Sequence, residues 1–196
     1  MKKFIGAIVM LAISLAMSAQ AKMSDADLIA AIAGNSASIQ SFSCKFKQTQ
    51  TVALLTAPVV STGEMQYQGD GKIFWKYTSP NAYELVVTPK AVTVHNGNGV
   101  SAISLEDNPL MARLMNMLVG IMGGSNIASP EGFKVGVSAS DKAVALNMSP
   151  TSRATGKMFK SIVLTFTPKD LLIETVTIEE ADGSTTAITF YDRKVK

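Results

Sequence analysis

The sequence has few of the side chains from which catalytic and metal sites are usually built. Its 196 residues include one cysteine, Cys44, and one histidine, His95. A single cysteine excludes an intramolecular disulfide and any site that holds a metal with several cysteines. The motifs of zinc proteases, serine hydrolases, phosphate-binding loops and dinucleotide-binding folds are also missing. We therefore expect no catalytic residues, no metal site and no cofactor, and we expect that the protein is not an enzyme.

Both of the rare side chains have ordinary explanations. Cys44 alternates with Phe42 and Phe46, so on a strand it lies on the same face as two phenylalanines. We expect it to act as a small buried hydrophobic residue, and a reactive thiol is the alternative. His95 directly precedes the turn signal Asn96-Gly97, which favours a solvent-facing loop histidine over a catalytic base.

The N-terminus has the pattern of a secretory signal peptide. Lys2 and Lys3 precede an apolar run over residues 4–17, and Ser18-Ala19-Gln20-Ala21 fits the A-x-A cleavage pattern. We place the cut after Ala21. The apolar run is shorter than the roughly 20 residues of a membrane span, which favours cleavage over the alternative of an N-terminal membrane anchor. We therefore expect a soluble mature protein that works outside the cytoplasm.

The rest of the chain, residues 22–196, has the size of one domain with a sizeable core. The formal net charge of +3 becomes +1 when the two leader lysines are subtracted, because the leader contains no acidic residue. A charge this close to neutral argues against a nucleic-acid partner. No cysteine lies near the cleavage site, so we also expect no lipid anchor at the new N-terminus.

Hydrophobic periodicity predicts one helix followed by many strands. The helix begins after Ser24, where Asp27 completes a capping box, and apolar residues follow at helical spacing up to Ile39. From Phe42 onward the period is two. The predicted strands cover residues 42–50, 63–68, 72–77, 83–88, 91–95, 101–105, 133–138, 143–148, 161–167, 171–179 and 184–191. An antiparallel sheet of this size tends to curl, and its concave apolar face can be covered by a helix.

A second helix is predicted in the middle of the chain. Asp107-Asn108-Pro109 is a typical helix start, and Gly123-Gly124 can end the helix. Its apolar stripe consists of Leu110, Met111, Leu114, Met115, Leu118, Ile121 and Met122. Methionine side chains are flexible and polarizable, so a stripe rich in them suits a site for acyl chains or peptides. Ordinary core packing is the alternative for this helix, as it is for the face shared by Ile73, Trp75 and Tyr77.

At residues 63–80 the chain resembles a known family. Gly63-Glu64-Met65-Gln66-Tyr67, followed by Lys72-Ile73-Phe74-Trp75-Lys76-Tyr77-Thr78-Ser79-Pro80, is similar to the signature of the periplasmic outer-membrane lipoprotein carrier proteins, the LolA family. The order of the other segments agrees with this family. A leader and an amphipathic helix come first, then Phe46-Lys47-Gln48 on the first strand, the central helix, and closing strands with Asp182-Gly183.

The resemblance implies an α+β fold that is mainly β, an incomplete and strongly curved antiparallel β-barrel whose open side is covered by helices. It also implies a function. Such a carrier, which we expect to be a periplasmic monomer, accepts lipoproteins from an inner-membrane releasing transporter. It binds their acyl chains in an apolar cavity and passes them to a possible acceptor at the outer membrane.

By position, the resemblance places Ile73 and Trp75 in the cavity and makes the helix over residues 110–122 its movable lid. The full set of candidate cavity residues is Phe46, Met65, Tyr67, Ile73, Trp75, Tyr77, Met111, Leu114, Met115, Leu118 and Met122.

One turn departs from the family pattern. Family members often carry an Arg-Pro pair before the tryptophan strand, and the arginine ties the lid shut, but this chain has Gly69-Asp70 there. The family's closing mechanism therefore does not carry over. The alternative function for a protein of this shape is an envelope sensing or regulatory module that binds a protein or lipid partner without transport.

Overall fold

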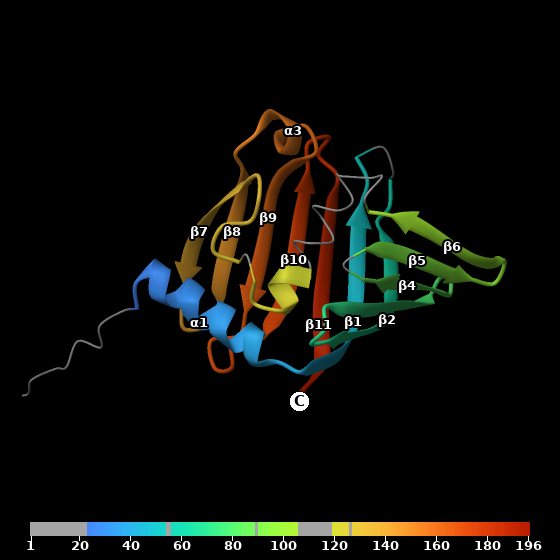
Figure 1. Ribbon diagram of the computed structural model, residues 1–196. Helices are drawn as coiled ribbons and strands as arrows, with labels where there is room; N and C mark the ends of the chain where they lie inside the picture. Colours follow the sequence, from blue (N-terminus) through green and yellow to red (C-terminus); the bar gives the residue numbers. More distant parts are fainter. Residues whose placement is uncertain (1–22, 54–55, 89, 106–118, 126) are drawn as a thin grey trace, which may run out of the picture.

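The computed structural model describes residues 23–53, 56–88, 90–105, 119–125 and 127–196. Eleven antiparallel strands form one sheet in these residues (Figure 1). The strands are β1 Ser41–Thr51, β2 Val59–Gln68, β3 Lys72–Ser79, β4 Tyr83–Val87, β5 Ala91–Asn96, β6 Gly99–Ser104, β7 Phe133–Ala139, β8 Val144–Pro150, β9 Phe159–Phe166, β10 Ile173–Glu180 and β11 Thr185–Val195.

The sheet consists of two meanders that are joined in its middle. The strand order is β6-β5-β4-β3-β2-β1-β11-β10-β9-β8-β7, so the first strand pairs with the last. Phe46 of β1 lies opposite Phe190 of β11 in this central pair. The two edges, β6 and β7, do not pair with each other, so the curved sheet is not closed. The predicted mainly β, incomplete barrel is therefore confirmed.

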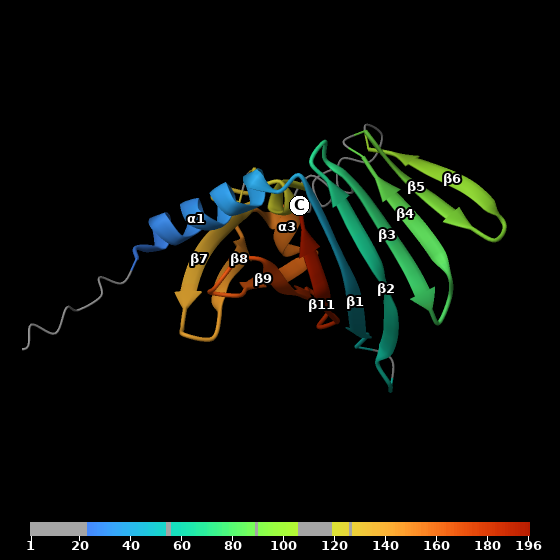
Figure 2. The same cartoon turned by 90° about the horizontal axis from the view of Figure 1, so that it is seen from below.

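Helix α1, Asp25–Ser38, begins where the sequence predicts. The Ser24 side chain accepts a hydrogen bond from the Asp27 backbone N–H, and its hydroxyl donates to the Asp27 carboxylate at 2.6 Å. The helix lies along the half of the sheet formed by β7–β11 (Figure 2). The amide of Asn35 ties it to this half by donating to the backbone oxygens of Asp170 and Leu171.

Part of the predicted central helix is described by the structure. Residues 119–122 are helical, and residues 106–118 lie outside the described part of the chain. This short helix lies on the same side of the sheet as α1 (Figures 1 and 2). The chain turns after it at Gly124, whose φ of +71° is left-handed, as the two glycines at 123–124 predict. Nowhere in the described residues is a helix both long and apolar enough to cross a membrane.

Other differences from the sequence prediction are small. Strand β2 begins earlier than expected, at Val59, and β11 runs on to Val195. A short helix, α3 Arg153–Gly156, was not expected, although the Ser152 side chain caps it by accepting from the Thr155 N–H.

His95 is exposed as predicted, but it lies near the end of β5 and not in a loop. Cys44 is buried as predicted, with 5% of its surface exposed.

Candidate functional site

The concave face of the sheet encloses an apolar cavity of about 220 Å³. Six adjacent strands from β4 to β10, together with the short helix at 119–122, contribute its walls. The lining residues are Gln48, Met65, Ile73, Trp75, Tyr77, Leu85, Val87, Ile121, Met122, Ile173, Val176, Ile178, Ile188 and Phe190. The strands reach one cavity from both halves of the chain because the sheet curves around it.

Strand alternation and register bring the first half of the lining together. Ile73, Trp75 and Tyr77 are spaced by two along β3, so they share one face. In the antiparallel register Trp75 lies between Met65 of β2 and Leu85 of β4. Side chains that lie directly opposite on neighbouring strands point to the same face and pack against each other. A row of apolar side chains therefore crosses the sheet at this level.

An aromatic cluster supports the wall of the cavity at Trp75. The ring of Phe46 lies 4.6 Å from that of Trp75, and the Phe190 ring meets Trp75 edge-on at 6.0 Å, both measured between ring centroids. Tyr77 stacks on Tyr83 with centroids 4.4 Å apart. Such aromatic pairs are worth about 0.5–1.5 kcal/mol each beyond the area they bury, so these contacts stabilise the wall.

Ile121 and Met122 close the end of the cavity that lies next to α1. Close backbone packing holds this segment there. A side chain at Gly124 would place its Cβ 2.1 Å from the backbone oxygen of Ala33 in α1, and one at Gly123 would meet the Tyr67 hydroxyl at 2.9 Å. Gly124, whose φ is also positive, therefore admits no side chain, whereas a methyl group at Gly123 would require the Tyr67 hydroxyl to shift. Among the described residues, no side-chain hydrogen bond ties residues 119–125 to the sheet, and their contacts with it are apolar packing contacts.

The few polar atoms of the cavity lie at its other end. The Tyr77 hydroxyl donates to Oε1 of Gln48 at 2.9 Å. Burial, followed by the neighbouring Tyr83, raises the pKa of Tyr77 to about 12, so the hydroxyl stays protonated at neutral pH. The indole nitrogen of Trp75 is buried and has no hydrogen-bond acceptor, unlike every other buried side-chain nitrogen or oxygen in the described residues. Such an orphaned donor costs about 1–3 kcal/mol.

Comparison with known families shows to which family this chain belongs. Residues 37–196 match the model of the outer membrane lipoprotein carrier protein LolA. The chain belongs to the LolA family. No curated protein is significantly similar to it in sequence.

Three solved structures share the fold at low sequence identity. An uncharacterized conserved protein from Thermus thermophilus is 10% identical, with a TM-score of 0.52 and coverage of 88% of both chains. The lipoprotein LppX of Mycobacterium tuberculosis is 11% identical, with a TM-score of 0.50, and covers 87% of this chain and 96% of its own. MucB, solved in complex with MucA, is 12% identical at a TM-score of 0.50, and the match spans 88% of this chain and 56% of MucB.

Five of the side chains expected in the LolA-type cavity line it. These are Met65, Ile73, Trp75, Tyr77 and Met122. Phe46 lies behind the wall, fully buried against Trp75, and Tyr67 packs behind the short helix at Gly123. The other expected residues, Met111, Leu114, Met115 and Leu118, lie outside the described residues.

The C-terminal half of the lining was missed by sequence reasoning. Ile173 and Val176 of β10 both face the cavity although they are three residues apart. A register irregularity between Ile173 and Thr175 shifts the alternation by one residue. Without that irregularity, period-two alternation predicts that Ile173 and Val176 face opposite sides of the sheet. The alternation of Ile188 with Phe190 in β11 was the available signal for the rest of this wall.

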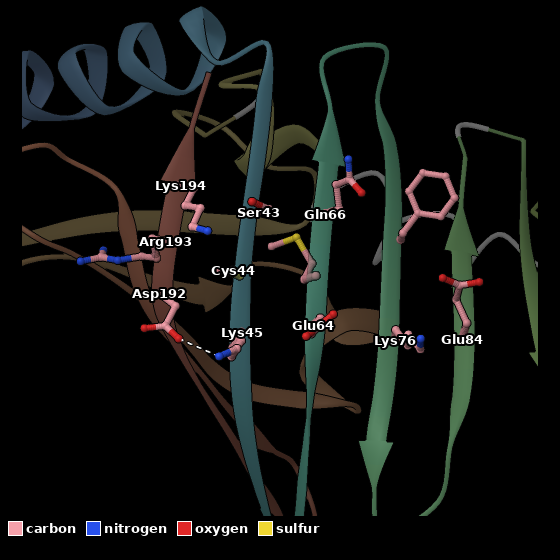
Figure 3. A pocket seen from close by; sticks show the side chains of 12 residues that line it. Ser43, Cys44, Lys45, Glu64, Gln66, Lys76, Glu84, Asp192, Arg193 and Lys194 are labelled. Carbon is pink, nitrogen blue, oxygen red and sulfur yellow. Dashed lines mark hydrogen bonds and ion pairs between the residues drawn. The ribbon is translucent and has the colours of Figure 1, made fainter.

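A larger hollow of about 640 Å³ lies on the outer face of the same strands (Figure 3). Its floor is a row of charges of alternating sign. Lys45 lies opposite Glu64, which lies opposite Lys76, which in turn lies opposite Glu84. Lys45 also forms an exposed ion pair with Asp192, with 3.0 Å between nitrogen and oxygen. The charges alternate in sign and remain in contact with water, which does not favour the binding of an apolar ligand.

The chemistry of reactive groups is equally sparse in this LolA-family chain. Burial raises the pKa of the Cys44 thiol to about 12, so the thiolate that a nucleophile or metal ligand needs is not formed at neutral pH. Within the described residues, no group of three or more histidine, cysteine or acidic side chains has the arrangement of a metal site. The arrangement on the concave face supports apolar binding.

Proposed function

We propose that this protein is a periplasmic carrier that binds the acyl chains of lipoproteins in its apolar cavity and shuttles them from the inner to the outer membrane. The observation that carries the proposal is the cavity itself, whose walls from six strands are almost entirely apolar. Membership of the LolA family supports it, because the family is described as outer membrane lipoprotein carriers. The secretory leader expected at residues 1–21 agrees with a periplasmic site of action.

Energetics make acyl chains a suitable cargo. Burial of each methylene contributes about 0.8 kcal/mol, so a chain of some 16 carbons supplies on the order of 10 kcal/mol before ordering costs. The cavity of about 220 Å³ is only somewhat larger than a cavity of roughly 150 Å³ that accepts one benzene. A whole acyl chain therefore enters only if the cavity widens. The segment of Ile121 and Met122, which packs on the cavity through apolar contacts, is the part that moves in this proposal.

This movement also explains how cargo can leave. A carrier that gained the full burial energy would never release its ligand, so opening a packed closed state must offset part of that gain. The empty protein recovers the packing of Ile121 and Met122 when the acyl chain departs. Partner proteins are part of the proposal: an inner-membrane transporter loads the carrier, and an acceptor at the outer membrane receives the cargo.

Trp75 provides a direct test, since it is the sole tryptophan and lines the cavity. Addition of a diacylated peptide to the mature protein is expected to change Trp75 fluorescence, and the same peptide without acyl chains is expected to leave it unchanged. Equal responses, or no response to either peptide, contradict the proposal.

A matched pair of variants on β4 sharpens this test. Leu85 lines the cavity and Val86, its neighbour, faces the opposite side of the sheet; both are half-buried. Leu85→Glu places a charge in the path of the acyl chain and is expected to weaken loading at least tenfold. Val86→Glu adds the same charge to the outer face and is expected to load normally. Equal loading by both variants removes this cavity from the binding site.

The alternative of a sensing module has one observation in its favour, the fold shared with MucB, which was solved in complex with MucA. A pull-down from periplasm and solubilised membranes separates the two functions. A carrier recovers many lipoproteins, and their recovery depends on the acyl chains. A sensing module recovers one membrane regulator whether or not lipoproteins are present.

A further inference from the structure

The two ends of the cavity differ in polarity. Its apolar end is formed by Ile73, Ile173 and the two residues of the short helix, Ile121 and Met122, that close the cavity. Tyr77 stands four residues further along β3 than Ile73, or about 13 Å at the usual rise per residue of a strand. Every polar side chain of the lining, namely Gln48, Tyr77 and the indole of Trp75, belongs to the other end or to the middle.

Trp75 supplies a fully buried hydrogen-bond donor that has no acceptor in the empty protein. The Tyr77 hydroxyl donates to Gln48, but the buried Trp75 Nε1–H finds no acceptor. The indole and the Tyr77 hydroxyl face each other, and the indole acts to lower the pKa of Tyr77, yet the pair falls short of hydrogen-bond geometry. A buried donor of this kind calls for an explanation, and a missing ligand atom is one.

We propose that the Trp75 N–H donates a hydrogen bond to the ester or amide carbonyl that joins an acyl chain to its head group. This inference rests on the proposed function and adds to it a point of recognition and an orientation. An indole N–H only donates and a carbonyl oxygen only accepts, so the two are matched. Trp75 is thus a specificity-determining residue, which distinguishes acyl chains from hydrocarbons that lack a carbonyl.

The same geometry orients the cargo. The carbonyl sits beside Trp75, Tyr77 and Gln48, and the hydrocarbon tail runs towards Ile121 and Met122. Because Nε1 is covered in the empty protein, the bond forms only once the entering chain has widened the cavity. A free carboxylate is disfavoured at this position, since none of the lining residues carries a positive charge.

The test compares two lipopeptides that differ in two oxygen atoms. In one, the N-terminal cysteine carries two hexadecanoyl chains on a glyceryl thioether as esters; in the other, two hexadecyl chains are attached as ethers. The mature protein is expected to bind the ester about threefold to tenfold more tightly, which is the usual gain from one hydrogen bond. Trp75→Phe is expected to bind both with equal affinity, because it keeps an aromatic ring and loses the donor.

Phe190→Leu is the matched control. Phe190 lines the cavity and contacts the Trp75 ring edge-on, so its truncation disturbs the same wall without removing the N–H. This variant is expected to bind both lipopeptides more weakly and to keep the preference for the ester. A preference that survives in Trp75→Phe, or that disappears in Phe190→Leu as well, overturns the inference.

A measurement on the unmodified protein does not depend on how the variants fold. Trp75 is the sole tryptophan, so a nitrogen-labelled sample shows a single indole N–H resonance. The ester lipopeptide is expected to shift this resonance downfield and to slow its exchange with solvent, and the ether is expected to do neither. Equal affinities with equal indole resonances overturn this inference and leave the carrier function standing. Binding of neither lipopeptide overturns the carrier function itself.

Discussion

The two faces of strands β1–β4 share one backbone and have opposite chemistry. The concave face encloses about 220 Å³ between apolar and aromatic side chains, and the outer face holds a hollow of about 640 Å³ above a row of alternating charges. The larger hollow is the poorer site for an apolar ligand, because its charges alternate in sign and stay hydrated. The chemistry of a surface, and not its volume, therefore indicates what the surface binds.

Adjacent residues of β3 show how the difference arises. Ile73 is buried in the concave face with 4% of its surface exposed. Its neighbour Phe74 borders the outer hollow, where the Lys72 ammonium lies 4.7 Å from the centre of its ring. This cation–π contact makes an aromatic residue acceptable on a polar face. The period of two therefore separates the two environments within a single peptide unit.

Adding one negative charge to each face tests this comparison with the largest expected effect. Ile73→Glu buries a carboxylate without a partner and is expected to lower the free energy of unfolding by about 3–5 kcal/mol. Phe74→Glu places the same charge beside Lys72 on the outer face and is expected to change it by less than about 1.5 kcal/mol. Denaturant unfolding of both variants measures the difference. Similar losses in the free energy of unfolding would mean that water has equal access to both faces.

Packing density provides the next contrast. A methyl group at Gly63 would lie 2.0 Å from the backbone oxygen of Lys76 and 2.6 Å from the Phe46 ring, so Gly63→Ala is expected to cost about 2–3 kcal/mol. At Gly136 of the edge strand β7, the nearest atom to such a methyl group is 3.9 Å away. Gly136→Ala is expected to be neutral or slightly stabilising, because alanine has less backbone freedom to lose. Thermal unfolding of the two variants checks the ranking.

Alkaline pH should lower the free energy of unfolding through two buried groups, Cys44 and Tyr77. Burial raises the pKa of Cys44 and of Tyr77 to about 12, above the ordinary values of 9.0 and 10.0 that apply when the chain is unfolded. The unfolded chain thus loses these protons first, and stability that is complete below about pH 9 declines as the pH rises towards 12. Unfolding free energies measured between about pH 8 and pH 11 test this decline. In Cys44→Ala the decline should be shallower, and an unchanged slope would assign it to other groups.

The smallest effect is expected from the outer ion pair. Lys45 and Asp192 are each more than half exposed, at 51% and 58% of their side-chain surfaces. Exposed pairs of this kind contribute little, so Lys45→Gln is expected to leave the melting temperature unchanged within error. A clear drop in the melting temperature, especially one that vanishes at high salt, would show that the outer face contributes more to stability than its exposure indicates.

Much of the fold follows from local sequence pattern. Alternation of apolar residues predicts the strands, and Ser24 with Asp27 predicts the start of α1, because both signals depend on residues close together in the chain. Ile73, Trp75 and Tyr77, which line the cavity, were expected there because they repeat at the period of a strand within the family signature. The shared orientation of Ile173 and Val176 was not predictable, because the irregularity near Ile173 breaks the period of two in β10.

By itself, the sequence determined which side chains share a face of each strand, since that depends only on the geometry of a two-residue repeat. It also determined the scarcity of catalytic groups. The pairing of β1 with β11, and the meeting of side chains from β4 and β10 around one cavity, arise only when the whole chain folds. These contacts arise from twist and curvature that accumulate across many strands and from pairing between the two ends of the chain, and no local pattern records either one.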